Sequence, residues 1–506
     1  MHKLNNKKLV TILTLSLPLL VGLFILLWIS SHGYIDVTTP STSKSLTYII
    51  SNQSGDKISN TQSSTGHVKK MVKKGTFVVS VEGDNKSYFK VTKTTGFLSV
   101  TKVSASLQSE KSREFVGNNP NFCTYYGQDI LYSYNCSEPG GLTVHLPATS
   151  STPTTTLTEK EEPYIPLVGL LSVGGINKAV ATDDEQDSVS VYDIDQQLRL
   201  ANPVGLYGVK ASDAQNVLPF KSGFLIYNSK LSKIDYFATP TSSSQSLNSV
   251  KPNKDTSNPA GLSTFSDQVG VLFNSGGDGG DDGLEASQTT TGVIGGTSQV
   301  ITYHNGQSKS YTLDKFYTSG GVCGINKLCL VNSGVLDVYD THSGKPLLVF
   351  SMKDVQRILS IRGLAIIATS NKVIALNPED LSGATQFTYG SGQYCGINES
   401  ANGYVLCQVT PKGDNVALYV DMGQTNTDSI DKKVYALLKS PDVSDVSVYK
   451  NFIYISPNLG QPVLNSTTQQ YEYDPVIKAS ANKKINEAVK RAGINQELYT
   501  VINPLR

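Results

Sequence analysis

Tryptophan, histidine and methionine are scarce in this chain, and its charges almost cancel. Of 506 residues, one is tryptophan, four are methionine and six are histidine, and the formal net charge is +1. Three N-terminal lysines account for the positive sign, so the chain beyond residue 30 is slightly acidic. A near-neutral surface argues against binding that depends on neutralising phosphates. We therefore expect no nucleic-acid partner.

Sequence signatures of common active sites are also missing. No G-x-S-x-G occurs, so a serine hydrolase would have no nucleophile elbow. No C-x-x-C occurs, and beyond residue 100 the histidines are the isolated His145, His304 and His342. Zinc sites and acid–base catalysis normally bring several such groups together. The sequence therefore identifies no catalytic and no cofactor-binding residue.

One long apolar run stands at the N-terminus. Leu9 to Ile29 carries no charged residue and is long enough to cross a bilayer as a helix. Lys3, Lys7 and Lys8 precede it without an acid, and a basic flank stays in the cytoplasm. Residues 1–8 are then a cytoplasmic tail and residues 9–29 a transmembrane helix. This predicts a single-pass cell-membrane protein whose bulk is extracellular or periplasmic.

The alternative for this run is a cleaved signal peptide. Such a peptide has a shorter apolar region that ends in a small-x-small cleavage site. Here the run ends in Leu27-Trp28-Ile29, and the tryptophan suits a membrane interface. We therefore favour an uncleaved signal-anchor over a removed leader.

The six cysteines form three local pairs along the chain. Local, even pairing in an exported protein indicates disulfide bonds, although six cysteines allow 15 connectivities and three pairs of free buried thiols are the alternative. The predicted pairs are Cys123 with Cys136, Cys323 with Cys329, and Cys395 with Cys407. Disulfide bonds between cysteines so close in the sequence would join the two strands of a β-hairpin.

Short alternating runs broken by Gly, Asn, Asp and Ser predict a mainly β protein. Residues 33–107 form a small unit of their own near the membrane, with strands expected at 33–37, 46–50, 75–81 and 87–91. Its Gly75-Thr76-Phe77 turn leads into alternating hydrophobic residues, and the stretch Val68–Val81 resembles the PEGA-type surface β-sandwich. The resemblance implies a stalk or spacer. The residues themselves predict a small antiparallel β domain.

Residues 110–475 contain a repeated strand that often ends in Asp or Asn. Its spacing is mostly about 40 residues, which is typical of a propeller blade. The copies lie at 142–145, 189–193, 233–236, 300–306, 335–340, 373–377 and 416–421, with a weaker eighth at 470–474. We expect a β-propeller of about seven or eight blades, with a pair of β-sandwich domains as the alternative.

The turn Val338–Lys345 resembles the blade turn of the quinoprotein-like and WD-repeat-like propeller group. With the N-terminal anchor, the chain resembles a bacterial membrane-anchored extracytoplasmic protein of this kind. Quinoprotein dehydrogenases hold their cofactor between tryptophans. The one tryptophan here lies in the N-terminal run, so that enzyme class is excluded.

A glycine-rich acidic loop is the one candidate metal site. Calcium takes six to eight oxygen ligands, and glycines let a loop wrap around it. The carboxylates are Asp278, Asp281, Asp282 and Glu285. Their spacing does not fit an EF-hand, so a solvated insertion is the alternative. No other cofactor is expected.

The last residues, 476–506, predict a helical tail. Ser480 can cap a helix, Gly493 can end it, and Ile485, Ala488 and Val489 form a narrow apolar stripe. The stripe favours packing on the propeller, and docking to a partner is the alternative.

These features favour a membrane-tethered binding or scaffold module for a protein or surface-polymer partner. The alternative is a propeller-based hydrolase or lyase with a site in the central channel. Three or more convergent acids, histidines or arginines in the channel would favour the enzyme. A lining of neutral polar side chains would favour binding, because the fold itself does not decide.

Overall fold

A computed structural model describes the chain from residue 21 to residue 502 with gaps, the longest at 135–142, 146–153, 157–166, 276–296 and 423–430. Two compact units are present. Residues 1–109 and 375–385 make up the first, and residues 110–374 and 386–506 the second.

The first unit is a small β domain of two sheets. One sheet has the order β4-β1-β7, and the other runs β6-β5-β2-β3. The strands are β1 (His32–Thr38), β2 (Leu46–Asn52), β3 (Lys57–Ser63), β4 (His67–Lys73), β5 (Gly75–Gly83), β6 (Lys86–Thr94) and β7 (Val100–Ser104). The four strands expected here are present as β1, β2, β5 and β6. However, β1 and β7 are parallel, so the prediction of a purely antiparallel domain was wrong.

Alternation along these strands builds the core of the small domain. Ile35 and Val37 of β1, Tyr48 of β2 and Val79 of β5 are buried between the sheets. Successive side chains of a strand point to opposite faces, so every second residue meets the core. Segment 375–385 adds the start of β32 (Ser382–Thr388), which pairs antiparallel with β6.

A helix at residues 21–31 runs directly into β1. Its large apolar side chains are exposed, with Phe24 at 72% and Leu26 at 62%. Among the residues that the structure describes, no helix is long and apolar enough to span a membrane. Residues 1–20, which include more than half of the apolar run, lie outside the described part.

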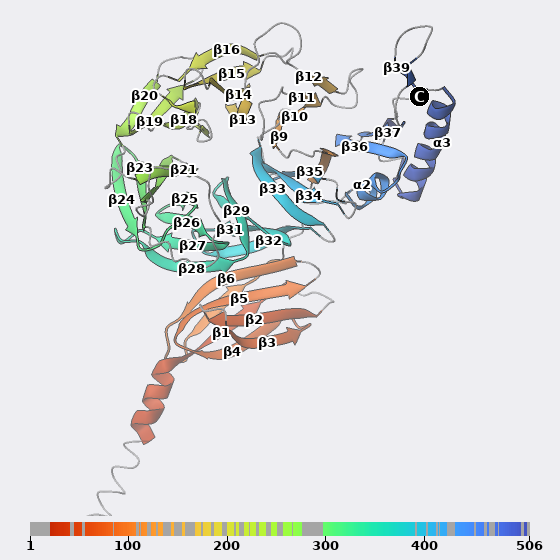
Figure 1. Cartoon of the computed structure of the whole chain (residues 1–506). Coiled ribbons are helices and arrows are strands. Elements are labelled where there is room, and N and C mark those ends of the chain that lie inside the picture. The colour runs from red at the N-terminus through yellow and green to blue at the C-terminus, as the bar shows by residue number, and fades with distance from the viewer. Residues whose placement is uncertain are drawn as a thin grey trace, which may run out of the picture. The chain divides into compact units, whose positions relative to one another are not determined.

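The second unit is a β-propeller with seven four-stranded blades in its described part (Figure 1). The first strands of successive blades are neighbours in the order β9, β13, β17, β21, β25, β29 and β33, and β33 lies beside β9. The first strands therefore form a closed ring.

Each blade is an antiparallel sheet of consecutive strands, with one exception. The first three are β9 (Cys123–Gly127), β10 (Ile130–Tyr134), β11 (Thr143–His145), β12 (Thr154–Thr156); β13 (Leu167–Val173), β14 (Ile176–Asp183), β15 (Ser188–Ile194), β16 (Leu200–Gly205); and β17 (Leu218–Phe220), β18 (Gly223–Asn228), β19 (Lys233–Ala238), β20 (Ser244–Ser249). The next two are β21 (Ser257–Phe265), β22 (Gln268–Ser275), β23 (Thr297–His304), β24 (Gln307–Leu313); and β25 (Ser319–Gly324), β26 (Lys327–Asn332), β27 (Val335–Asp340), β28 (Leu347–Lys353). The sixth blade has β29 (Val355–Ile361), β30 (Leu364–Thr369), β31 (Lys372–Asn377) and β32.

The seventh blade is the exception, because its outermost strand comes from the start of the unit. It holds β33 (Gln393–Ser400), β34 (Gly403–Val409) and β35 (Asn415–Asp421), and β8 (Arg113–Asn118) pairs with β35. The ring is thus closed by hydrogen bonds between its two chain ends.

All seven strong copies of the repeated strand are the third strands of blades. The weak copy at 470–474 is not an eighth blade: it contains β39 (Tyr471–Glu472), which pairs with β38 (Val463–Leu464) alone. Blades bury both faces against their neighbours, so all six residues of β18 are buried. In one such interface between blades, Phe224 of the third blade belongs to the same buried apolar cluster as Val191 of the second.

After the seventh blade the chain forms α2 (Asp431–Leu438), β36 (Val443–Tyr449), β37 (Phe452–Pro457), α3 (Pro475–Arg491) and β40 (Thr500–Ile502). The predicted C-terminal helix is α3. It begins at Pro475, not at Ser480, because proline suits the first turn of a helix. Gly493 follows it with a positive φ of 67°, as the predicted stop requires.

Candidate functional site

A hollow in the described part of the second unit lies among the first strands of the blades. Its volume is about 360 Å³. The lining residues are Leu218, Pro219, Ala260, Gly261, Leu262, Ser263, Thr264, Ser319, Gly320, Gly321, Val322, Cys323, Cys329, Gln356, Arg357, Ile358, Leu359, Ser360, Ala365 and Glu399. Because these come mainly from β17, β21, β25, β29 and β33, the hollow is the central channel of the propeller.

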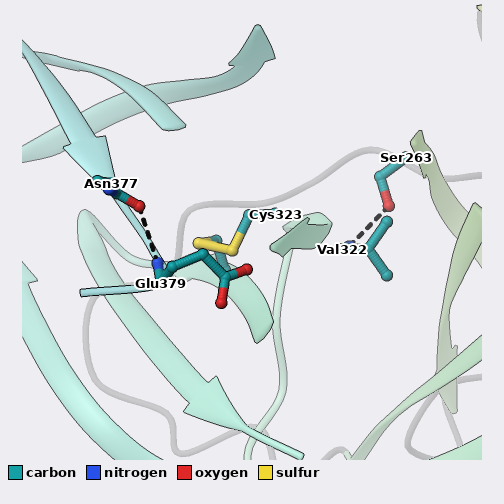
Figure 2. Close-up of a disulfide and its surroundings, with 6 residues drawn as sticks. Ser263, Val322, Cys323, Asn377 and Glu379 are labelled. Carbon is teal, nitrogen blue, oxygen red and sulfur yellow. Dashed lines mark hydrogen bonds between the residues drawn. A yellow bond between two sulfur atoms is a disulfide. The ribbon is translucent and has the colours of Figure 1, made fainter. Parts of the chain in front are cut away.

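Close contact between β21 and β25 shapes one wall of this channel. The Ser263 hydroxyl accepts a hydrogen bond from the Val322 amide at 2.9 Å, beside Cys323 (Figure 2). A Cβ on Gly321 would lie 1.9 Å from the Ser263 Oγ, so a side chain there would push the strands apart. Gly320 has a φ of +112°, which only glycine adopts readily. These glycines keep the wall thin and leave backbone groups at the channel surface.

Two of the described residues that line the channel are charged. Arg357 on β29 and Glu399 on β33 are the only charged residues in the seven first strands of the ring. Both side chains are exposed to solvent. The other residues of the lining are uncharged. They carry hydroxyl or amide groups, are glycine, or are apolar.

The channel changes the acidity of the groups within it. Burial raises the pKa of Glu399 to about 7. Its side chain keeps exposed surface in the channel, but the surrounding protein atoms disfavour the charged form of the carboxyl group. Burial also raises the pKa of Tyr394, although the positive charge of Arg357 opposes that rise. The raised pKa of Glu399 therefore lies close to neutral pH.

Two predicted disulfides join the first and second strands of blades. Cys323 on β25 is bonded to Cys329 on β26, and Cys395 on β33 to Cys407 on β34. Their Cα atoms are 5.7 and 5.1 Å apart, within the normal range for a disulfide. These two predictions are confirmed. Cys123 lies on β9, and its predicted partner Cys136 is outside the described residues.

Among the described residues that line this channel, the predicted site residues are Cys323 and Cys329. The acidic residues Asp278, Asp281, Asp282 and Glu285 lie outside the described residues. In the part that is described, no group of three or more His, Cys, Asp or Glu side chains could hold a metal. His304 is not isolated as expected: its Nε2 lies 3.1 Å from Oδ2 of Asp267, and it lines a second cavity of about 290 Å³.

Sequence reasoning missed Arg357 and Glu399. The repeat is recognised in the sequence by its third strands, and the first strands carry no pattern that marks them as the channel lining. Once each segment is assigned to its strand position in the blade, a search of the first strands for ionisable residues finds both.

No known family model matches this chain, and no curated protein matches it. Similar solved structures include the Cps50 (Swd1) β-propeller domain of Myceliophteria thermophila, with 10% identity, a TM-score of 0.37, and coverage of 61% of this chain and 99% of that one. YCF48 bound to D1 peptide gives 9% identity and a TM-score of 0.39, covering 63% of this chain and 99% of that one. The N-terminal domain of Nup159 has 11% sequence identity and a TM-score of 0.34, and the match covers 62% of this chain and 97% of that one. Since these scores are low, the propeller assignment rests on the strand order and the closed ring.

Proposed function

We propose that this chain is a membrane-tethered, extracytoplasmic β-propeller that binds a partner in its channel. The observation that carries the proposal is the charge pattern of the first strands, where Arg357 and Glu399 stand among neutral side chains. Hydrolases and lyases need several ionisable groups around the reacting atoms. The described lining supplies two, which suits recognition better than catalysis.

A protein segment fits this lining better than a surface polymer does. Arg357 can hold a carboxylate and Glu399 an ammonium group. Serine hydroxyls and glycine backbone groups elsewhere in the lining suit the amides of an extended chain. A neutral glycan offers no ionised group to either side chain, and an acidic one offers an ion pair to Arg357 alone. A peptide segment bearing both charges uses the whole channel.

Membrane tethering is supported by the apolar run Leu9–Ile29 and by the exposed apolar side chains of the helix at 21–31. Exposed apolar surface of this extent normally has a partner. Lipid is the partner that an uncharged run of this length fits. Carbonate extraction of membranes tests this part: a tethered chain stays in the pellet, and release into the supernatant would contradict the tether.

Binding is tested with full-length protein in lipid nanodiscs. Peptides selected from a displayed library are measured by fluorescence anisotropy against Arg357→Gln, Glu399→Gln and the control double variant Lys345→Gln/Glu487→Gln, whose residues are exposed elsewhere on the unit. Loss of one charge-assisted contact should weaken binding about tenfold. Binding of peptides with a free amine should also strengthen as the pH rises through about 7, where Glu399 ionises.

Three results would redirect the proposal. Equal binding by wild type and both channel variants would exclude the channel as the site. Enrichment of no peptide, together with binding of acidic polysaccharide fragments, would make the partner a surface polymer. Cleavage of the peptides, detected by mass spectrometry and lost in Glu399→Gln, would establish the hydrolase alternative.

A further inference from the structure

One end of the small β domain carries an unusual exposed turn. Gly96, Phe97 and Leu98 all have positive φ values of 85°, 53° and 50°. Side-chain-bearing residues rarely adopt this conformation, and it costs about 1 kcal/mol or more for each of them. Phe97 is nevertheless 75% exposed, so burial of its own ring does not offset that cost.

This turn is attached to the end of the helix at 21–31. The Leu98 amide donates to the His32 carbonyl at 2.8 Å, and the Tyr34 amide donates to the Ser99 carbonyl at 2.7 Å. A Cβ on Gly96 would lie 2.1 Å from the Ser30 carbonyl oxygen, so the turn is pressed against the last residues of the helix. Because the helix passes into β1 without a linker, the position of the helix fixes the position of Phe97.

Exposed apolar and basic side chains lie at the same end of the small domain. Val100 and Met71 face Tyr34 across the β4-β1-β7 sheet, and both are exposed. Lys73 and Lys74 are exposed at the turn between β4 and β5, and the Lys74 amide donates to the Ser31 carbonyl at 2.7 Å. Exposed apolar groups flanked by lysines are typical of surfaces that enter the headgroup layer of anionic membranes.

We propose that this end of the small domain, formed by Phe97, Val100, Met71, Lys73 and Lys74, is seated on the lipid surface, with Phe97 inserted among the headgroups. The proposal rests on the tether proposed above. A helix crossing the bilayer and ending at residue 31 places the turn at the interface, since the turn contacts residues 30–32. The strained turn then presents an aromatic ring where interfacial aromatics are favoured. Its role is to hold the domain upright on the membrane.

The test uses full-length protein in vesicles of phosphatidylcholine and phosphatidylserine, some with brominated acyl chains. Trp28 is the single tryptophan, so Trp28→Phe removes the background signal and Phe97→Trp adds a probe at the turn. The matched control, Trp28→Phe/Thr65→Trp, places the probe in an exposed turn at the opposite end of the same strands. Brominated lipid should quench tryptophan at position 97 and shift its emission to the blue, and should leave tryptophan at position 65 unchanged.

Flotation of the same samples separates the possible failures. Protein that floats with vesicles but shows no quenching at position 97 overturns the lipid contact and leaves the tether intact. Protein that does not float overturns the tether and the lipid contact together. Quenching at both positions would mean that the domain lies flat, which contradicts end-on seating. Lys73→Glu/Lys74→Glu should reduce quenching at position 97 on anionic vesicles more than on neutral ones.

Discussion

At the scale of single residues, Asp337 is the hub of a buried network between the fourth and fifth blades. It lies on β27 with 3% of its surface exposed. Lys315 donates to its Oδ2 at 2.9 Å and Tyr317 at 2.7 Å, and Ser351 donates to Oδ1. The Tyr317 amide in turn donates to Ser298 of the fourth blade at 2.8 Å. The Asp337 carboxylate therefore links the segment between the fourth and fifth blades to the fifth blade.

We predict that Asp337→Ala destabilises the propeller by about 2–3 kcal/mol, because the buried Tyr317 hydroxyl loses its charged acceptor. The free-energy change comes from urea denaturation followed by tyrosine fluorescence. The matched control is Asp340→Ala on the same strand, whose pair with Lys327 is partly exposed. Partly exposed ion pairs contribute about 0–1 kcal/mol. Equal losses in the two variants would show that the network does not stabilise the blade contact.

The same carboxylate gives a pH dependence. Burial alone would raise the pKa of Asp337, but hydrogen bonds from Ser351, Lys315 and Tyr317 outweigh burial and hold the pKa below its usual range. The folded state then binds fewer protons than the unfolded chain. The stabilisation is complete above about pH 4 and is lost as the pH falls through the folded pKa. In Asp337→Ala this part of the acid-dependent loss should be absent.

At the scale of elements, the two disulfides occur at matching positions in different hairpins. Cys323 and Cys395 each lie where the register of the strand pair shifts, as the extra residue of a bulge. The repeated Cys-Gly-Ile-Asn sequence nevertheless has two structures. In the fifth blade Ile325 and Asn326 form the turn, whereas in the seventh the strand continues to Ser400. The bridges therefore close loops of separation 6 and 12.

We predict that Cys395→Ser/Cys407→Ser lowers stability by about 2–3 kcal/mol and that Cys323→Ser/Cys329→Ser lowers it slightly less. In the chain-entropy model, doubling the loop length adds about 0.6 kcal/mol. Thermal midpoints in the absence of reductant give the comparison. Treatment of wild type with reductant should lower the midpoint more than either variant does, because it opens both bridges. If Cys323→Ser/Cys329→Ser lost more stability than Cys395→Ser/Cys407→Ser, native packing and not loop length would determine how much each bridge stabilises the protein.

The sequence predicted strands where hydrophobic residues alternate or cluster, and missed them elsewhere. Every third strand of a blade was predicted, since its apolar residues are often followed by Asp or Asn. The strand β4 was missed because, of its seven residues, only Val72 is buried and four are Lys or His. The helix α2 was missed because its eight residues are too few to show a periodic pattern. Arg357 and Glu399 were missed because their importance depends on which strands line the channel.

At the scale of the whole molecule, closure of the propeller joins distant parts of the chain. The strand β8 pairs with β35, and Leu418 faces Phe115 across about 300 residues of sequence. Such closure costs chain entropy, although the cost grows slowly with length. In return, the first and last strands of the ring cannot separate without breaking a ladder. No local pattern in residues 113–118 predicted this pairing, because its partner strand lies at the other end of the unit.

We predict that breaking this ladder opens the ring and makes unfolding less cooperative. Glu114→Pro/Phe115→Pro removes the amide hydrogens of two adjacent residues, and since adjacent residues of an edge strand alternate in facing the ladder, at least one hydrogen bond to β35 is lost. The control Glu114→Ala/Phe115→Ala changes the same side chains and keeps both amides. The proline variant should unfold over a broader temperature range, expose the seventh blade to protease and increase the radius of gyration in X-ray scattering. If both variants behave alike, the side chains of β8 rather than its ladder hold the ring closed.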